Sequence, residues 1–170
     1  IVTNAVDDSA LLVETAGNIQ LDRVKVKDSR NNGDGARTGA TLDNSSSSIA
    51  SSVTVNNGIF ENNEGDGLRI YSAGVVTITS IAADGNDEGG VIIDNSFAVS
   101  DQPVTLSGSQ GYNNNGNGPG LQVVSNGFVT ISNVIASANA GDGVSIDNRG
   151  SASGQGVLVA GTNTFNDNAN

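Results

Sequence analysis

The chain has 170 residues, which suits one domain with a core of its own. It contains no Cys and no His, so disulfides, thiolate or imidazole metal sites and His-dependent catalytic triads are excluded. The net charge of −11 argues against nucleic acid as a partner, and no apolar run is long enough to span a membrane. Gly, Asn, Ser and Asp make up almost half of the chain, and Val and Ile outnumber Leu. Turn formers together with β-branched residues predict many short strands.

Two short apolar segments recur in alternation along the chain. The first has the form Gly-apolar-x-apolar or a close variant, and some copies continue with Asp-Asn. Its copies are residues 10–13, 39–44, 67–70, 90–95, 120–123 and 143–148. The second resembles Val-Thr-Ile and occurs at residues 19–21, 53–55, 76–78, 104–106, 129–131 and 157–159. The spacing indicates an array of units of roughly 25 residues with loops of variable length.

Each segment predicts a short strand in which buried and exposed side chains alternate. The first residues of the second segment are expected to face inward; they include Val53, Val76, Val104 and Val129. One unit cannot bury its apolar face alone, but units stacked about 4.8 Å apart build a continuous apolar column. The hydrophobic core is therefore predicted to run along the whole stack.

Asparagines precede the Gly-rich corner between the two segments, and we expect them to form a ladder of hydrogen-bonded amides. The predicted members are Asn63, Asn86, Asn114 and Asn139. The full pattern, Val-Thr-Ile followed by Asn-x-Gly-Asp-Gly-Val-x-Ile, resembles the right-handed parallel β-helix repeat of pectin-lyase-like proteins. The resemblance covers residues 11–168. It implies an all-β solenoid of about six coils without a capping helix, forming one domain over residues 1–170 that is a candidate unit of a longer array.

The family includes polysaccharide lyases and hydrolases, phage tailspikes and bacterial surface proteins, so the resemblance leaves the activity open. A lyase of this kind would need a basic residue beside clustered Asp ligands, but the predicted strand neighbours of Arg69 are Thr41 and Ile92. Asp43, Asp94 and Asp147 recur only on alternate coils, which separates them by about 9.6 Å. This distance exceeds the separation of the two catalytic carboxyl groups in retaining glycosidases and lies at the wide end of the range for inverting glycosidases. We therefore predict no catalytic residues.

Acidic residues in Gly-Asp-Gly corners offer a candidate metal site. Asp66 and Asp142 have this context, as does Asp34. Oxygen ligands on turns suit calcium, so Asp66 and Asp142 are candidate ligands, although no cofactor is required. The same triplets are ordinary turn sequences, and that interpretation is the favoured one.

A rank of hydroxyl groups is predicted on the outer face of the second segment. Its members are Thr54, Thr77, Thr105 and Thr130. With the polar residues two positions further on, they resemble the flat Thr-x-Thr face of ice-binding proteins, although Thr is also a good residue for any exposed strand position.

The chain begins and ends inside coils, which leaves strand edges at both ends without a partner. The expected self-association residues are Leu11, Val13, Val157, Val159 and Phe165. We therefore expect a non-enzymatic structural module of an extracellular fibre, filament or adhesin stalk, secreted or at the cell surface, which stacks on copies of itself or on flanking coils of the same protein. A β-helix that binds or degrades polysaccharide is the alternative, and ice binding is the third hypothesis.

Overall fold

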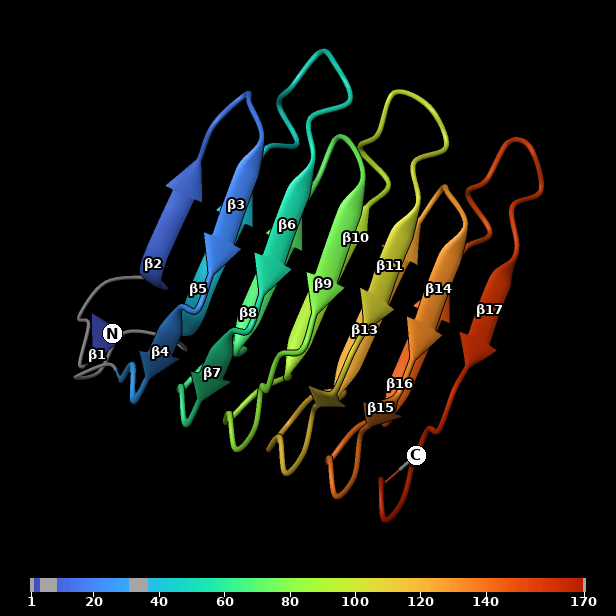
Figure 1. Ribbon diagram of the computed structural model, residues 1–170. Coiled ribbons are helices and arrows are strands. Elements are labelled where there is room, and N and C mark those ends of the chain that lie inside the picture. Colours follow the sequence, from blue (N-terminus) through green and yellow to red (C-terminus); the bar gives the residue numbers. More distant parts are fainter. Residues whose placement is uncertain (1, 4–8, 31–36, 170) are drawn as a thin grey trace.

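The computed structural model describes residues 2–3, 9–30 and 37–169, so Asp34, which shares the Gly-Asp-Gly context of the candidate ligands, lies outside the described residues. All regular elements in this part of the chain are strands, and every pairing between them is parallel. The strands stack side by side along one axis, with the N-terminal strands at one end and the C-terminal strands at the other (Figure 1). This arrangement is a solenoid, in which each coil contributes one strand to each face.

Two faces of the solenoid are six-stranded sheets. The first sheet contains β2 (Ser9–Glu14), β5 (Thr38–Asp43), β8 (Leu68–Tyr71), β10 (Val91–Asn95), β13 (Leu121–Ser125) and β16 (Val144–Asp147), hydrogen-bonded in that order. The second sheet contains β3 (Ile19–Asp22), β6 (Val53–Asn56), β9 (Val76–Thr79), β11 (Val104–Ser107), β14 (Val129–Ser132) and β17 (Val157–Ala160). The six strands in each sheet confirm the predicted six coils, and the all-β parallel fold is confirmed with them.

The third face was not predicted. It consists of β1 (Val2–Thr3), β4 (Lys25–Lys27), β7 (Ile59–Glu61), β12 (Gln110–Gly111) and β15 (Val134–Ile135), extended by single bridges through Ala82 and Thr164. These strands have only two or three residues, too few for an alternating pattern to be visible in the sequence. This face nevertheless fills one side of the core with large, fully buried side chains, among them Phe60 of β7 and Tyr112, which directly follows β12.

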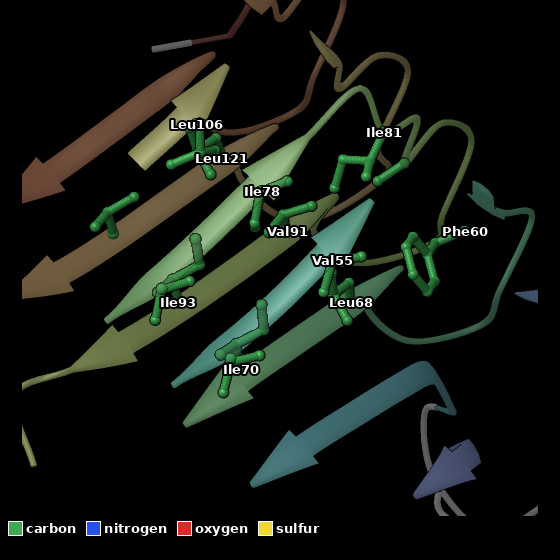
Figure 2. Close-up of a cluster of buried hydrophobic side chains, with 14 of the residues drawn as sticks. Val55, Phe60, Leu68, Ile70, Ile78, Ile81, Val91, Ile93, Leu106 and Leu121 are labelled. Atoms are coloured by element: carbon green, nitrogen blue, oxygen red, sulfur yellow. The ribbon is translucent and has the colours of Figure 1, made fainter. Parts of the chain in front are cut away.

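Equivalent residues of successive coils lie directly over one another, as the repeat predicted. Val53 pairs with Val76, which pairs with Val104, and Val104 in turn pairs with Val129. All four side chains are completely buried. In the first sheet Leu68, Val91 and Leu121 stack in the same way. Side chains of the two sheets meet between the layers, where Ile78, Ile93 and Leu106 lie in one continuous core (Figure 2).

The amide ladder exists, but one of its predicted members is wrong. The column runs through Asn63, Asn86, Asn115 and Asn139, which are buried, to the half-buried Asn168. The Nδ2 of each amide donates a hydrogen bond to the Oδ1 of the amide on the next coil. Asn114 lies one position too early and has a positive φ of 55°, as do Asn62 and other residues that precede ladder members. Two roles are thus divided between neighbours: one residue adopts the left-handed conformation and the next forms the ladder.

The connections from the first to the second sheet alternate between short and long. Residues 15–18, 72–75 and 126–128 form the short turns, and residues 44–52, 96–103 and 148–156 form the long loops. The long loops project from one edge of the solenoid on every second coil (Figure 1). The structural repeat is therefore two coils rather than one.

Candidate functional site

The outer face of the first sheet carries a shallow groove that passes Arg69 and Tyr71. Two adjoining hollows of about 370 and 400 Å³ share these two side chains. One hollow is also lined by Asp66, Glu88 and Gln122. The other extends toward the first coil, where it is lined by Ser9, Leu12, Glu14, Thr38 and Thr41. Tyr71, which lines both hollows, packs edge-on against Phe97 of a long loop, with ring centroids 6.3 Å apart.

Arg69 is fixed in this groove by an ion pair with Asp66 that the sequence analysis did not predict. Its strand neighbours are Thr41 and Ile92, as expected, but the guanidinium Nε donates to Asp66 Oδ2 three residues earlier. Asp66 Oδ1 accepts a 2.7 Å hydrogen bond from the backbone N–H of Gly89. Both carboxylate oxygens of Asp66 are thus already used, so this residue positions Arg69 and stabilises the corner.

The acids at the strand ends act as turn residues. Asp43, Asp94 and Asp147 alternate in the first sheet with Tyr71 and Val124. Asp94 Oδ1 accepts a 2.9 Å hydrogen bond from the backbone N–H of Ser96. Asp43 and Asp147 accept the equivalent hydrogen bond from the backbone N–H of the residue two positions further along the chain. Hydrogen bonds from the Arg149 side chain hold the pKa of Asp147 well below its usual range. No two of these acids lie on adjacent coils, so they do not form a catalytic pair.

The described residues provide no cluster of ligands for the predicted metal site. Within residues 9–30 and 37–169, no three acidic side chains gather in a way that could hold a metal ion. Asp142 is half-buried and lies beside a cavity at the C-terminal end, together with Asp167. Asp66 and Asp142 are on different coils and do not share a site.

The predicted hydroxyl rank is continuous on the outer face of the second sheet. Thr54 pairs with Thr77, Thr77 with Thr105, and Thr105 with Thr130. The rank ends at Gln20 in the first coil and at Leu158 in the last. A second rank begins beside it, where Asn56 and Ser107 both pair with Thr79.

The C-terminal coil exposes the interior of the stack. β16 and β17 are the end strands of their sheets. Val157, Val159 and Phe165 are 46%, 52% and 43% exposed, although residues in the same columns of earlier coils are fully buried. A cavity of about 470 Å³ opens beside Val159 and Phe165 and is also lined by Ile131, Val144 and Ile146. An apolar surface of this kind is typical of a binding surface rather than of a face in contact with water.

A family model for the right handed beta helix region matches residues 9–170. The chain belongs to this family. No curated protein and no solved structure matched it. Right-handed β-helix domains occur in enzymes and in non-enzymes, so membership establishes the fold and leaves the activity to be argued from the surfaces.

The β-helix groups the predicted self-association residues at its two ends. Leu11 and Val13 of the first coil are only partly buried, and Val157, Val159 and Phe165 are exposed on the last. The groove around Arg69 was missed because its acid, Asp66, lies in the preceding corner and not on an adjacent strand. The described residues contain no helix with the length and apolar character needed to cross a membrane.

Proposed function

We propose that this β-helix is a non-enzymatic structural module of a secreted or cell-surface fibre, filament or adhesin stalk. The observation that carries the proposal is the end face of β16 and β17, where the apolar columns of the core reach the surface. An additional coil would cover Val157 and Val159 as Val129 and Ile131 are covered. Burying each such side chain is worth roughly 1.5–3 kcal/mol, so extension of the stack is favourable.

The acids support a structural role, because the structure uses them to hold turns and corners. Asp43, Asp94 and Asp147 each accept hydrogen bonds from the turn that follows them. Asp66 holds Arg69, and Glu61 pairs with Lys27 on the third face. A catalytic acid or base must instead reach a substrate and change its protonation state there.

The test is an assay for the release of unsaturated uronides from polygalacturonate, with and without calcium. We expect no product under either condition from the wild-type chain. Product that disappears in Arg69→Ala but persists in Thr130→Ala, a substitution on the opposite outer face, would overturn the structural role. Calcium as a bound ion remains a proposal for Asp66 and Asp142, and an unchanged melting temperature on calcium addition would contradict it.

Polysaccharide binding without cleavage is the second candidate, and the groove of the first sheet favours it. Arg69 and Tyr71 lie between its two hollows, and sugar rings pack well against aromatic side chains. An acidic polysaccharide would pair with the guanidinium group that Asp66 orients. Affinity electrophoresis in polygalacturonate gels would show retardation of the wild-type chain that is lost in both Arg69→Ala and Tyr71→Ala and kept in Thr130→Ala.

Ice binding is the third candidate, and the in-register rank of four Thr side chains favours it. The expected sign is thermal hysteresis that falls in Thr77→Leu and Thr105→Leu. Absence of hysteresis at high protein concentration would remove this hypothesis.

A further inference from the structure

Two adjoining hollows, the third-face hollows, lie where the strands of the second sheet turn into the third face. Their volumes are about 390 and 470 Å³, and the exposed side chain of Ser109 lines both of them. The first hollow is also lined by Asn57, Ile59, Ser80 and Ala82. The second hollow is also lined by Asn133, Ile135 and Thr162. Together they extend along the solenoid axis over the second to the sixth coil.

An extra residue in the fourth coil and another in the sixth form the ridges beside these hollows. Residues 108–110 stand opposite only two residues of the third coil. Residues 161–163 likewise stand opposite only two residues of the fifth coil. In both places the chain turns through a glycine with a positive φ, of 77° and 72°, so that the extra residue projects. The projecting residues are Ser109 and Thr162, both exposed, and a hollow precedes each of them.

Apolar and uncharged polar side chains line the third-face hollows together. Ile135 in the second hollow is exposed, and the Oδ1 of Asn133 accepts a 3.1 Å hydrogen bond from the N–H of Thr162. Among the described residues, no charged side chain lines either hollow, although the net charge of the whole chain is −11. Glu61 and Asp84 of the same face belong to the next outward column, two residues further along the chain. The hollows therefore suit an uncharged, apolar side chain.

Side chains of this kind protrude at the opposite edge of the second sheet. The long loops 44–52 and 96–103 lead into its strands, whereas the hollows lie where its strands end. Figure 1 shows these loops along one edge of the solenoid and the third face along the opposite edge. Ile49 and Val99 at the loops are 68% and 66% exposed, more than any other large apolar side chain of the described residues. In both loops the apolar residue is flanked directly by Ser and Ala, without a charge.

The loops have the same spacing and the same height along the axis as the hollows. The loops leave the second and fourth coils and lie against the next short turns, Ser51 against Gly74 and Gln102 against Gly127. They are thus level with the third and fifth coils, over which the two hollows are centred. In both cases two coils separate the features, or about 9.6 Å. A second copy displaced along the strand direction, with no shift along the axis, would place one loop at each hollow.

We propose that a second copy of this chain docks laterally, with its Ile49 in the first hollow and its Val99 in the second, so that two solenoids lie side by side with parallel axes. This inference rests on the proposed structural role and adds a lateral contact to the stacking along the axis. The two surfaces that meet are different, so the contact does not close and extends into a sheet of solenoids. One pair of loops makes a weak contact, but such contacts add up between fibres whose copies are already linked.

The charge of the chain explains why these surfaces meet. Two copies of net charge −11 repel each other, and the repulsion is least where neither surface carries a charge. Salt screens this repulsion, so we expect lateral association to strengthen by about threefold or more between about 0.05 M and 0.5 M sodium chloride. A contact made by ion pairs would weaken instead, and that result would overturn the proposal.

Disulfide cross-linking tests the register, because the chain has no Cys of its own. Ala82 lines the first hollow and Ile135 the second. We expect Ile49→Cys mixed with Ala82→Cys to form a covalent heterodimer under mild oxidation, with little homodimer of either variant. Val99→Cys mixed with Ile135→Cys should do the same. In each mixture the loop that keeps its apolar residue holds the two copies in register.

The matched control exchanges the partners and mixes Ile49→Cys with Ile135→Cys. This pair is displaced by roughly 9.6 Å along the axis, beyond the Cα separation of about 7 Å that a disulfide can bridge, so we expect an initial rate at least about tenfold lower. Equal rates for matched and exchanged mixtures, homodimers as the main products, or no cross-link at all would each overturn the lateral docking. The uronide assay is independent of this result: product there would overturn the structural role, whereas failed cross-linking without product would overturn only the lateral contact.

Filling a hollow tests the contact without changing the loops. Ala82→Phe puts a ring where Ile49 of the second copy would lie, and should weaken association in sedimentation velocity by about tenfold. The matched control is Thr77→Phe, which adds the same ring to the outer face of the second sheet in the same coil. Equal effects of the two substitutions would contradict the proposal. Protection of the Ala82→Cys thiol from alkylation by cellohexaose, but not by excess wild-type chain, would assign the hollow to a neutral sugar and overturn it as well.

Discussion

Asn63 Nδ2 donates a 2.9 Å hydrogen bond to Asn86 Oδ1 on the next coil, and the backbone N–H of Asn63 donates to the same oxygen at 3.1 Å. Both side chains are almost completely buried. Asn86 in turn donates to Asn115 Oδ1 and to the carbonyl of Phe60, each at 3.1 Å. The corner of the β-helix thus satisfies its buried polar groups by repetition, each amide supplying the acceptor for the coil before it.

Replacing Asn86 with Ala should strongly destabilise the fold. The substitution leaves the N–H and the amide of Asn63 without an acceptor and the Phe60 carbonyl without its donor. Each buried group left unpaired costs roughly 1–3 kcal/mol, so we expect the free energy of unfolding to fall by about 3 kcal/mol or more. Urea denaturation followed by circular dichroism measures it.

The control for this prediction is Asn117→Ala, because Asn117 is exposed and makes one hydrogen bond to a backbone carbonyl. We expect it to cost less than about 1 kcal/mol. Similar losses for the two variants would mean that the ladder adds nothing beyond an ordinary amide contact.

The sequence predicted this ladder but placed one member a residue early, at Asn114 instead of Asn115. In a run of three asparagines, composition cannot tell which residue takes the positive φ and which turns its amide inward; the backbone of the neighbouring coils decides it. The strands of the two large sheets were predictable because their apolar residues alternate over four to six positions. The third face was not, because its strands are too short to show a period and depend on Phe60 and Tyr112 for packing.

The glycine directly before β10 is required by close packing between coils. A Cβ at Gly90 would lie 2.4 Å from the carbonyl oxygen of Gly120 and 2.9 Å from Asn115 Nδ2. Gly90→Ala therefore forces a backbone or the ladder to move, and we expect a loss of roughly 1–3 kcal/mol in thermal or urea unfolding.

Gly17→Ala is the matched control, since the nearest atom to its added Cβ, Thr15 Oγ1, lies at an ordinary 3.6 Å. We expect no loss there, and at most a gain of about 1 kcal/mol from the less flexible unfolded chain. Equal destabilisation by the two substitutions would contradict the packing argument.

The groove was less predictable than the fold. The sequence correctly indicated the strand neighbours of Arg69, because register follows directly from the repeat. The pairing with Asp66 depends on the side chain folding back along its own chain, which a repeat pattern does not report. The open end face was indicated by incomplete coils, whereas the alternation of short turns and long loops became visible only when the coils were aligned in space.

Stability should depend on pH through Asp84. Burial raises the pKa of Asp84 above its usual 3.8, against the hydrogen bonds from Asn113 that lower it. As the pH rises from 3.8 to the folded-state pKa, the unfolded chain loses the proton first, so folded stability falls through this window and the penalty is complete above it. Asp84→Asn removes the charge and keeps an oxygen for Asn113. We therefore expect it to stabilise the protein at pH 7 and to make little difference at pH 3.

Urea unfolding of both proteins between pH 3 and pH 7 measures this difference. If Asp84→Asn raises the free energy of unfolding by the same amount at every pH, or by more at pH 3, the desolvated carboxylate is not the cause of the stabilisation.

The exposure of the end face can be tested by making the same Val→Ala substitution twice in one core column, once in the interior and once at the end, and comparing the losses of stability. Val55 and Val159 occupy equivalent positions, linked in register through Ile78, Leu106 and Ile131. Val55 is fully buried and Val159 is 52% exposed. Val55→Ala should cost about 2–3 kcal/mol through lost burial and the cavity it leaves, whereas Val159→Ala should cost less than about 1 kcal/mol at low protein concentration. At concentrations where copies stack, Val159 becomes buried and its substitution should shift the midpoint of assembly as well. A large cost for Val159→Ala in the isolated chain would mean that this end is already covered, and the stacking surface would then have to lie elsewhere.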